Sequence, residues 1–213
     1  MTRTVIQSDD IASGAVDSGL SSVQTFTSSG TWTRPSGITK VVVEVQGAGG
    51  SGSDGQAGNN KNNNGGSGGY VKKLLDVSSI SSATITIGTG GTGVENSYTG
   101  NDGGDSSWVD GINTLTGGGG GGPVNTDNYG GIGGTATGGD INIVGQNGGG
   151  YAARRGADSM FGYGGDWGNF SGSGGTSTSR ANVAVGYGAG GCGVYDGLPS
   201  NGSNGIVIIW EYK

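Results

Sequence analysis

Residues 41–52, VVVEVQGAGGSG, join an alternating apolar run to a cluster of glycines. Gly47, Gly49 and Gly52 match G-x-G-x-x-G, which in dinucleotide-binding proteins opens a helix whose amino end holds the pyrophosphate. The residues that follow, SGSDGQAGNNKNNNGGSGG at 51–69, are almost all glycine, asparagine and serine, which are poor helix formers. The stretch therefore predicts a short strand that runs into an extended glycine-rich segment, and it argues against a nucleotide site.

The composition limits what kind of core the chain can build. It has 213 residues, of which 54 are glycine and 3 are proline, and only 31% are hydrophobic when glycine is set aside. A large aliphatic core is therefore not available. Glycine does not recur at every third position and proline is scarce, which excludes collagen. Apolar and β-branched runs at 40–45, 83–87 and 206–210 argue against disorder, so we expect a folded domain.

Charge and the termini exclude several classes of partner. The formal charge of −6 argues against nucleic acid, because phosphate contacts need clustered lysine and arginine. No run of about 20 apolar residues indicates a membrane span. The first ten residues, MTRTVIQSDD, lack the hydrophobic stretch of a signal peptide.

No catalytic or metal site is expected. The chain has no histidine, so neither Cys192 nor Ser67, in GGSGG, has an imidazole base, and we expect no enzymatic activity and no cofactor. Cys192 is interpreted as a small packed residue. Asp102 and Asp105, in NDGGDSS, lack the full ligand spacing of a calcium loop, so we expect a turn there and no metal.

The expected fold is all-β and irregular, with essentially no α-helix. A short antiparallel sheet region is combined with a packed stack of glycine-rich polyproline II-type (polyglycine II) helices, in which glycine lets neighbouring chains approach closely enough for N–H to O=C bonds. We expect a connector at 1–22 and one domain at 23–213, with strands within 23–115 and 206–212 and the stack over about 116–205. The strands are predicted from 23 onward and at 40–45, 70–77, 83–87, 106–115 and 206–212.

An ordered set of segments resembles the glycine-rich domain at the tips of bacteriophage tail fibres, which includes adhesins built on polyglycine II helices. The matching segments are FTSSGTWTRPSGITKVVVEVQGAGGSG (26–52), GGSGGYVKKLLDV (65–77), ATITIGTGGTG (83–93), GGDSSWVDG (103–111), TGGGGGG (116–122) and NGIVIIWEYK (204–213). The lead segment DDIASGAVDSG (9–19) is also similar to repeats in phage fibre proteins.

The resemblance implies a protein of the virion, made in the host cytoplasm without a signal peptide, that binds a receptor on the host bacterium. The receptor would be an outer-membrane protein or a glycan. Residues 1–22 would attach the domain to other tail-fibre or virion subunits, and the resemblance is compatible with a homotrimer. Neither nucleic acid binding nor membrane insertion is implied.

Recognition must come from the connectors between glycine clusters, because a glycine lattice has almost no side chains. Tyrosine, tryptophan and arginine are enriched at binding hot spots. The candidate receptor-binding residues are Tyr151, Arg154, Arg155, Phe161, Tyr163, Trp167 and Phe170, together with Tyr129 and Tyr195. The alternative is that several of these rings cover glycine layers as lids. A second group of aromatic residues is expected in the strand core: Phe26, Trp32, Tyr70, Trp108 and Trp210.

Two other functions share this fold prediction. One is a purely structural fibre or virion decoration subunit, which keeps the fold without a receptor. The other is an ice-binding polyglycine II protein, which needs a flat, regular, threonine- or alanine-rich face. The threonines at 84, 86, 89, 92, 135 and 137 do not form a sustained array in the sequence.

Overall fold

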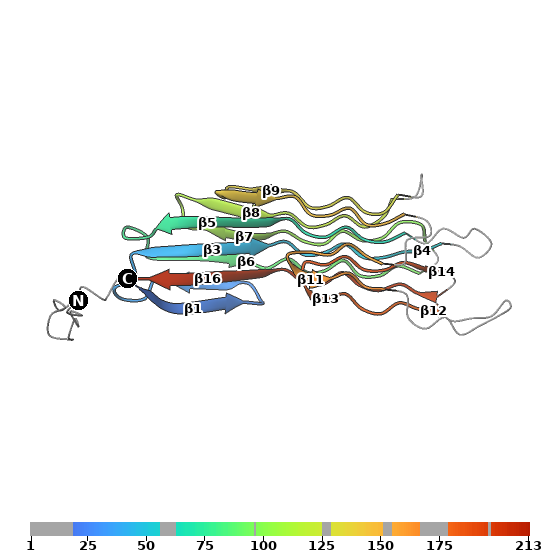
Figure 1. Cartoon of the computed structure of the whole chain (residues 1–213), viewed down its shortest axis with the longest axis horizontal. Coiled ribbons are helices and arrows are strands. Elements are labelled where there is room, and N and C mark those ends of the chain that lie inside the picture. The colour runs from blue at the N-terminus through green and yellow to red at the C-terminus, as the bar shows by residue number, and fades with distance from the viewer. Residues whose placement is uncertain are drawn as a thin grey trace, which may run out of the picture.

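The computed structural model describes residues 19–55, 63–95, 97–124, 129–150, 155–166, 179–195 and 197–213. This part of the chain is all-β and contains no α-helix, as expected. It is elongated, with a β-sandwich at the end where the C-terminus lies and long glycine-rich segments running away from it (Figure 1). The described residues include no helix that is long and apolar enough to cross a membrane.

Two five-stranded antiparallel sheets form the sandwich. In spatial order, sheet A consists of β1 (Leu20–Phe26), β16 (Ile206–Tyr212), β3 (Lys40–Gln46), β5 (Tyr70–Asp76) and β10 (Ile141–Ile143). Sheet B consists of β2 (Gly30–Thr33), β6 (Ser82–Thr86), β7 (Ser106–Val109), β8 (Thr114–Gly117) and β9 (Ala136–Thr137). Three short pairs complete the set: β11 (Phe161–Tyr163) with β13 (Val185–Tyr187), β12 (Ser179–Arg180) with β15 (Gly197–Leu198), and β14 (Val194–Tyr195) with β4 (Asp54–Gly55).

The apolar core lies between the two sheets. Alternate residues of β3, Val41, Val43 and Val45, are fully buried and belong to the same core cluster as Trp32 and Trp108. The two tryptophan rings lie 5.0 Å apart between centroids. The alternation of residues 40–45 therefore gives the inward face of β3, because successive side chains of a strand point to opposite sides of its sheet.

A buried carboxylate lies in this core. Glu211 is 0% exposed, and its Oε1 accepts hydrogen bonds from Trp32 Nε1 at 2.7 Å and from Gln24 Nε2 at 2.8 Å. Its Oε2 accepts a hydrogen bond from the Ser22 hydroxyl. These donors come from β1 and β2, so Glu211 ties the two sheets together at the point where the chain enters the sandwich.

We expect Trp32→Phe to lower the free energy of unfolding by about 1–3 kcal/mol more than Trp210→Phe, because only the first removes a donor to a buried carboxylate. Trp210 is the control for loss of an indole N–H, since its Nε1 is buried and has no hydrogen-bond partner among the described residues. Denaturant unfolding of both variants measures the difference. Equal losses would show that the Glu211 cluster does not stabilise the sandwich.

The outer faces of the two sheets differ in chemistry. On sheet B, Thr31 pairs with Thr84, and Thr116 pairs with Thr137, on the side opposite the buried Trp32 and Trp108. On sheet A, the outward row is apolar and consists of Val23, Trp210, Val42 and Leu74, which are paired in that order. Val23 is 44% exposed and Leu74 is 56% exposed. Sheet B thus has the hydroxyl-rich face of a solvated sheet. The outer face of sheet A carries this apolar row between two rows with charged residues, Lys40 and Asp76 on one side and Glu44 and Lys72 on the other.

The structure differs from the sequence prediction in three places. Residues 106–115 do not form one strand, because Asp110 accepts the N–H groups of Ile112 and Asn113 and turns the chain between β7 and β8. Trp210 faces outward from sheet A and is only partly buried, whereas Trp32 and Trp108 are in the core as predicted. The first strand begins at Leu20, within the segment expected to be a connector.

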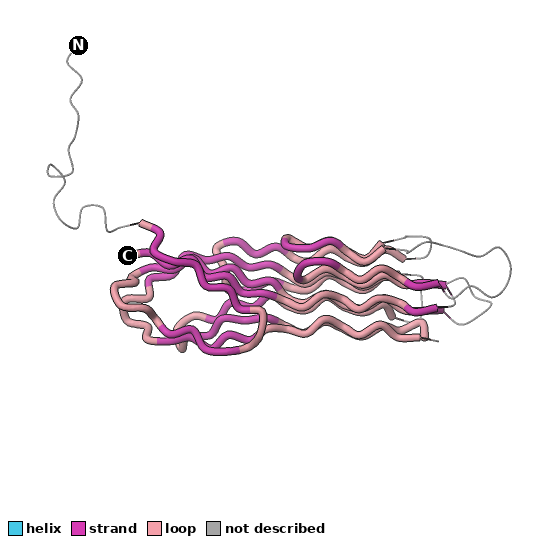
Figure 2. Tube along the Cα trace, turned by 90° about the horizontal axis from the view of Figure 1, so that it is seen from below, coloured by secondary structure: helices cyan, strands magenta, loops and turns pink. Residues whose placement is uncertain are grey.

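The glycine-rich stack also begins much earlier in the sequence than residue 116. Most strands of the sandwich continue directly into an extended glycine-rich segment, which we call a pass. The passes run side by side along the long axis (Figure 2). Successive passes run in opposite directions, away from the sandwich and back. In chain order they are 47–54, 63–69, 88–95, 97–105, 117–124, 129–135, 144–150, 155–158, 163–166, 179–184, 188–195 and 197–205.

The pass 47–54 lies at the centre of a hydrogen-bonded lattice. From Gly47 to Ser53, its N–H groups donate in turn to three different neighbours, at N to O distances of 2.9–3.1 Å, and the cycle repeats every three residues. Gly47, Gly50 and Ser53 donate to pass 63–69, Ala48 and Ser51 to pass 97–105, and Gly49 and Gly52 to pass 197–205. A three-residue period without bonds inside the segment is the geometry of a polyproline II helix.

Carbonyl groups of the same pass accept bonds from three further passes. Gly120, Gly91 and Gly191 donate to the carbonyls of Ala48, Gly49 and Gly50 respectively. The pass 47–54 therefore has six hydrogen-bonded neighbours, and its residues are buried although they carry few side chains. Hydrogen-bonded backbone replaces an apolar core here, because an unpaired buried peptide group would be costly.

Close approach between passes requires glycine. A Cβ atom added at Gly49 would lie 1.9 Å from the carbonyl oxygen of Ala189, and one added at Gly131 would lie 1.7 Å from that of Gly121. Both contacts are with backbone, which cannot move without separating the passes. The glycine clusters are thus a packing requirement of the lattice.

We expect Gly49→Ala to lower the free energy of unfolding by about 3 kcal/mol or more, because a methyl group at this site overpacks the lattice. Gly30→Ala is the matched control, since a Cβ there meets only Phe26 side-chain atoms, the nearest at 3.6 Å. The control should change stability by less than about 1 kcal/mol. Thermal and denaturant melts of both variants give the comparison, and a Gly49→Ala protein as stable as the control would contradict the lattice packing.

Side chains terminate the lattice at its edges. The N–H groups of Gly119 and Gly122 donate to Asp105 Oδ1 and Asp102 Oδ1, each at 2.8 Å. In the same way, the N–H groups of Gly90 and Gly93 donate to the side-chain oxygens of Asn204 and Asn201 at 2.9 and 2.8 Å. The N–H groups that point outward from a three-fold helix recur every three residues. The aspartate and asparagine acceptors that bind them are therefore also three residues apart.

Candidate functional site at the connector end of the stack

The connectors between outward and returning passes begin and end at the end of the stack that is opposite the sandwich. Ser53 bridges both Asn63 and Val94, and Arg155 bridges Asp166. The short pairs β4–β14 and β12–β15 lie at this same end (Figure 1). The residues that flank positions 56–62, 96, 125–128, 151–154, 167–178 and 196 are therefore gathered on one end face of the molecule, which we call the connector end.

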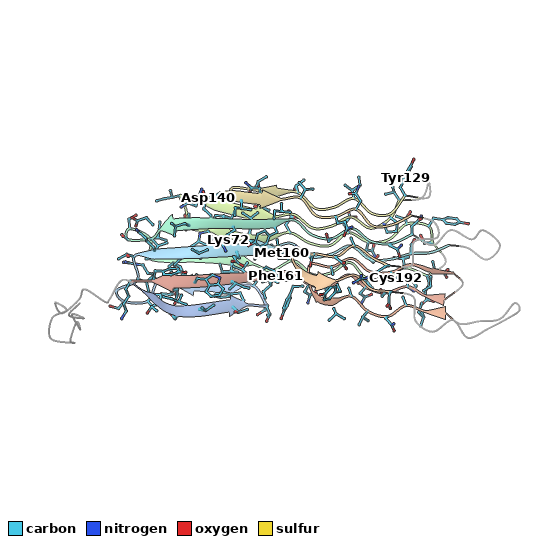
Figure 3. The ribbon with its side chains drawn as sticks, in the orientation of Figure 1. Lys72, Tyr129, Asp140, Met160, Phe161 and Cys192 are labelled. Carbon is cyan, nitrogen blue, oxygen red and sulfur yellow. The ribbon has the colours of Figure 1, made fainter. Side chains whose placement is uncertain are left out.

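Most of the predicted binding residues belong to these connectors. Tyr151, Arg154, Trp167 and Phe170 lie outside the described residues, in segments whose flanks are at the connector end. Tyr195 pairs through its backbone with Gly55 at this end, and its side chain is outside the description. Tyr129 is 70% exposed and lies at the connector end (Figure 3).

Three other candidates lie on a hairpin formed by residues 155–166. Its tip, where Ser159 bridges Gly162, is near the junction between the stack and the sandwich, and β11 follows it (Figure 1). Phe161 packs edge-to-face against Tyr70, with ring centroids 5.7 Å apart. This contact places the Phe161 ring against β5 at the junction.

Arg155 and Tyr163 form a small polar cluster on the same hairpin. The Arg155 guanidinium lies 5.4 Å from the centroid of the Tyr163 ring and pairs with the Asp158 carboxylate at 2.9 Å. Tyr163 is 67% exposed. Figure 3 shows Phe161 near the junction and Tyr129 at the connector end.

The Tyr70 hydroxyl group is held protonated at the junction. Burial raises the pKa of Tyr70 to about 12, and the neighbouring Glu44 carboxylate adds to this shift. Glu44 is itself 7% exposed and pairs with Lys72 Nζ at 2.8 Å. This cluster braces β3 against β5, where both strands meet the stack.

The predicted packed role of Cys192 is confirmed. Its side chain is fully buried beside Ala181 and Val194, and its Sγ donates to the carbonyl of Gly193 at 3.1 Å. Burial raises the pKa of the thiol to about 12, and the nearby Asp166 carboxylate contributes in the same direction.

We expect Cys192 to report the opening of the stack. At pH 8 the thiol in the folded protein is protonated, so a maleimide should react roughly 100-fold or more slowly than with the urea-unfolded chain. The folded-state rate should still be rising above pH 9, where an ordinary thiol is already largely ionised, because burial raises the pKa of Cys192 to about 12. Mass spectrometry of the labelled chain follows the reaction, and equal rates for the folded and unfolded chains at pH 8 would contradict a buried Cys192.

The described residues combine a hydrogen-bonded scaffold with the connector end. Within them, no group of three or more acidic or cysteine side chains is placed to hold a metal ion. Asp102 and Asp105, expected in a turn, instead cap lattice N–H groups. Sequence reasoning missed the exposed apolar residues Val124, at the connector end of pass 117–124, and Ile132, at the middle of pass 129–135. No pattern in the sequence singles them out.

Comparison with known protein families identifies the class. A family model described as a glycine-rich domain matches residues 22–211, so the chain belongs to this family of glycine-rich domains. A comparison with curated proteins gives no match.

Proposed function

We propose that this glycine-rich domain is the tip of a bacteriophage tail fibre and binds a receptor on the host bacterial surface through its connectors. The observation that supports this most is the convergence of the connectors on one end of the stack, opposite the sandwich. Of the candidate binding residues, Tyr129 lies at this end, and Tyr151, Arg154, Trp167 and Phe170 belong to connectors whose flanks are there. Phe161 lies instead near the junction. The proposed role is binding, without catalysis.

The lattice suits a binding surface that must vary. Each outward pass is followed by a returning pass that runs in the opposite direction, and a connector joins the two. A connector can therefore change in length or composition without moving the glycine passes that support it. Loops on a rigid scaffold are a common arrangement for recognition. Tyr129 and the connectors containing Tyr151, Arg154, Trp167 and Phe170 form the proposed receptor face.

Attachment is proposed at the opposite end. Residues 1–22 lead into β1, which is an edge strand of sheet A. The apolar outer row of that sheet, which includes Val23 and Leu74, lies at the same end as the C-terminus. An apolar row on the sheet that β1 borders fits packing against other fibre subunits or sister copies in a homotrimer.

Two alternatives remain as rival proposals. A purely structural fibre or decoration subunit would have the same lattice and would bury the connector end against another virion protein. For ice binding, Thr84 and Thr86 do join a hydroxyl face on sheet B. The row of Thr86 continues through Ser107, Thr116 and Thr137, but Val109 interrupts the row of Thr84 before Thr114, so the face is not a regular array. Thr89 and Thr92 lie on a glycine pass and do not extend that face.

We expect Tyr129→Ala and Trp167→Ala to abolish labelling of host bacteria by the fluorescent protein, whereas Tyr163→Ala should label as the unmodified chain does. Tyr129 and Tyr163 are a matched pair, because they are 70% and 67% exposed but lie in different places. Flow cytometry over a broad panel of bacterial strains, with melting curves for each variant, provides the measurement. Labelling of no strain, or equal loss in all three variants, would count against recognition at the connector end.

A further inference from the structure

A groove of about 440 Å³ runs along the outside of pass 117–124, where the lattice has no further neighbour. Its floor is backbone of Gly118, Gly119, Gly121 and Gly122. One wall comes from pass 97–105 and the other from pass 129–135, so the groove occupies the place that one more pass would take.

One wall of the groove is apolar. Ile132, at the middle of pass 129–135, is 71% exposed, and Val124, at the connector end of pass 117–124, is 59% exposed; both line the groove. Tyr129 precedes Ile132 by three residues, which places it on the same side of a three-fold pass. Exposed apolar side chains grouped beside a groove indicate a binding surface more than scattered ones do.

The opposite wall carries fixed hydrogen-bond acceptors. Asp102 and Asp105 each use Oδ1 to accept an N–H of the groove floor at 2.8 Å. An ionised carboxylate has about four lone-pair sites, so capacity to accept further hydrogen bonds is left on each. The residues that line the groove include no lysine or arginine, so the two carboxylates disfavour an anionic ligand.

The same hydrogen bonds argue against another glycine-rich pass as the occupant. The floor N–H groups of Gly119 and Gly122, which such a pass would need as donors, already donate to the aspartates. A ligand of the groove should instead bring its own donors to the carboxylates and an apolar face to Ile132 and Val124. Sugar rings have this combination, with hydroxyl donors at the rim and C–H groups on the face.

We propose that the groove binds a segment of uncharged, hydroxyl-rich polysaccharide from the host surface. Ring faces pack against Ile132 and Val124, and hydroxyl groups donate to Asp102 and Asp105. This inference rests on the proposed receptor-binding function and specifies the receptor class for this groove.

The test uses the full chain on an array of uncharged bacterial surface polysaccharides. The unmodified protein should bind one or a few of them, and Ile132→Arg should weaken that binding at least tenfold. Ile112→Arg is the matched control, because Ile112 is 75% exposed but lies in the turn between β7 and β8, away from the groove. Asp102→Asn and Asp105→Asn, which keep an oxygen for the floor N–H groups, should weaken binding while the melting temperature is unchanged.

Failure of the groove is distinguishable from failure of the proposed function. No binding to any polysaccharide, or equal binding by the Ile132→Arg and Ile112→Arg variants, would overturn the proposal that the groove binds polysaccharide. If Ile132→Arg still labels host cells while Trp167→Ala does not, the groove is likewise overturned but receptor binding by the connectors stands. If the unmodified chain labels no cells, the receptor function fails, and array binding lost only in Ile132→Arg would still support a polysaccharide site.

Discussion

The stack depends on one interaction, the N–H to O=C hydrogen bond between neighbouring glycine-rich passes. Along residues 47–53, each N–H group donates to a different neighbouring pass from the N–H group before it, and the same three neighbours recur every three residues. Such bonds form only where no side chain holds the passes apart, which is why a Cβ at Gly49 or Gly131 would overlap a neighbouring carbonyl oxygen. A chain with little apolar side-chain volume can therefore still bury a continuous interior, with satisfied peptide groups in place of hydrocarbon.

The sandwich sets the alignment of this lattice. Polyproline II passes have no hydrogen bonds of their own and would slide without an external register. Here β3 runs into pass 47–54, pass 63–69 runs into β5, and pass 197–205 runs into β16, so paired strands fix where the passes begin. The packed core around Trp32 and Trp108, together with the Glu211 cluster, thus holds one end of the stack, and the connectors are held at the other.

The sequence predicts the strands and the glycine-rich segments better than it predicts how they are arranged in space. The alternation in residues 40–45 correctly indicates a strand, and the poor helix-forming residues after Gly47 correctly predict that the chain continues in an extended form rather than as a helix over 47–55. The location of Tyr129, Phe161 and Tyr163 could not be predicted, because it depends on where each pass turns back. The 155–166 hairpin turns near the junction instead of entering the sandwich, which places Phe161 on Tyr70 rather than with Tyr129. The aspartates and asparagines that accept hydrogen bonds from outward N–H groups are spaced three residues apart in the sequence. This spacing is informative only once the three-residue period of the lattice is known.

Amide hydrogen exchange, resolved by residue, tests the hydrogen-bonded glycine interior most directly. If the lattice is the core described above, the amides of Gly47–Ser53 and of Ser67–Gly69 should exchange only through global unfolding, with the same protection as Val43 and Val45 in the sandwich. The outward Thr89 and Thr92, in an edge pass, should exchange sooner. Exchange of the 47–53 amides at the rate of an open chain, while the sandwich stays protected, would show that the sandwich folds without a lattice and would contradict the account.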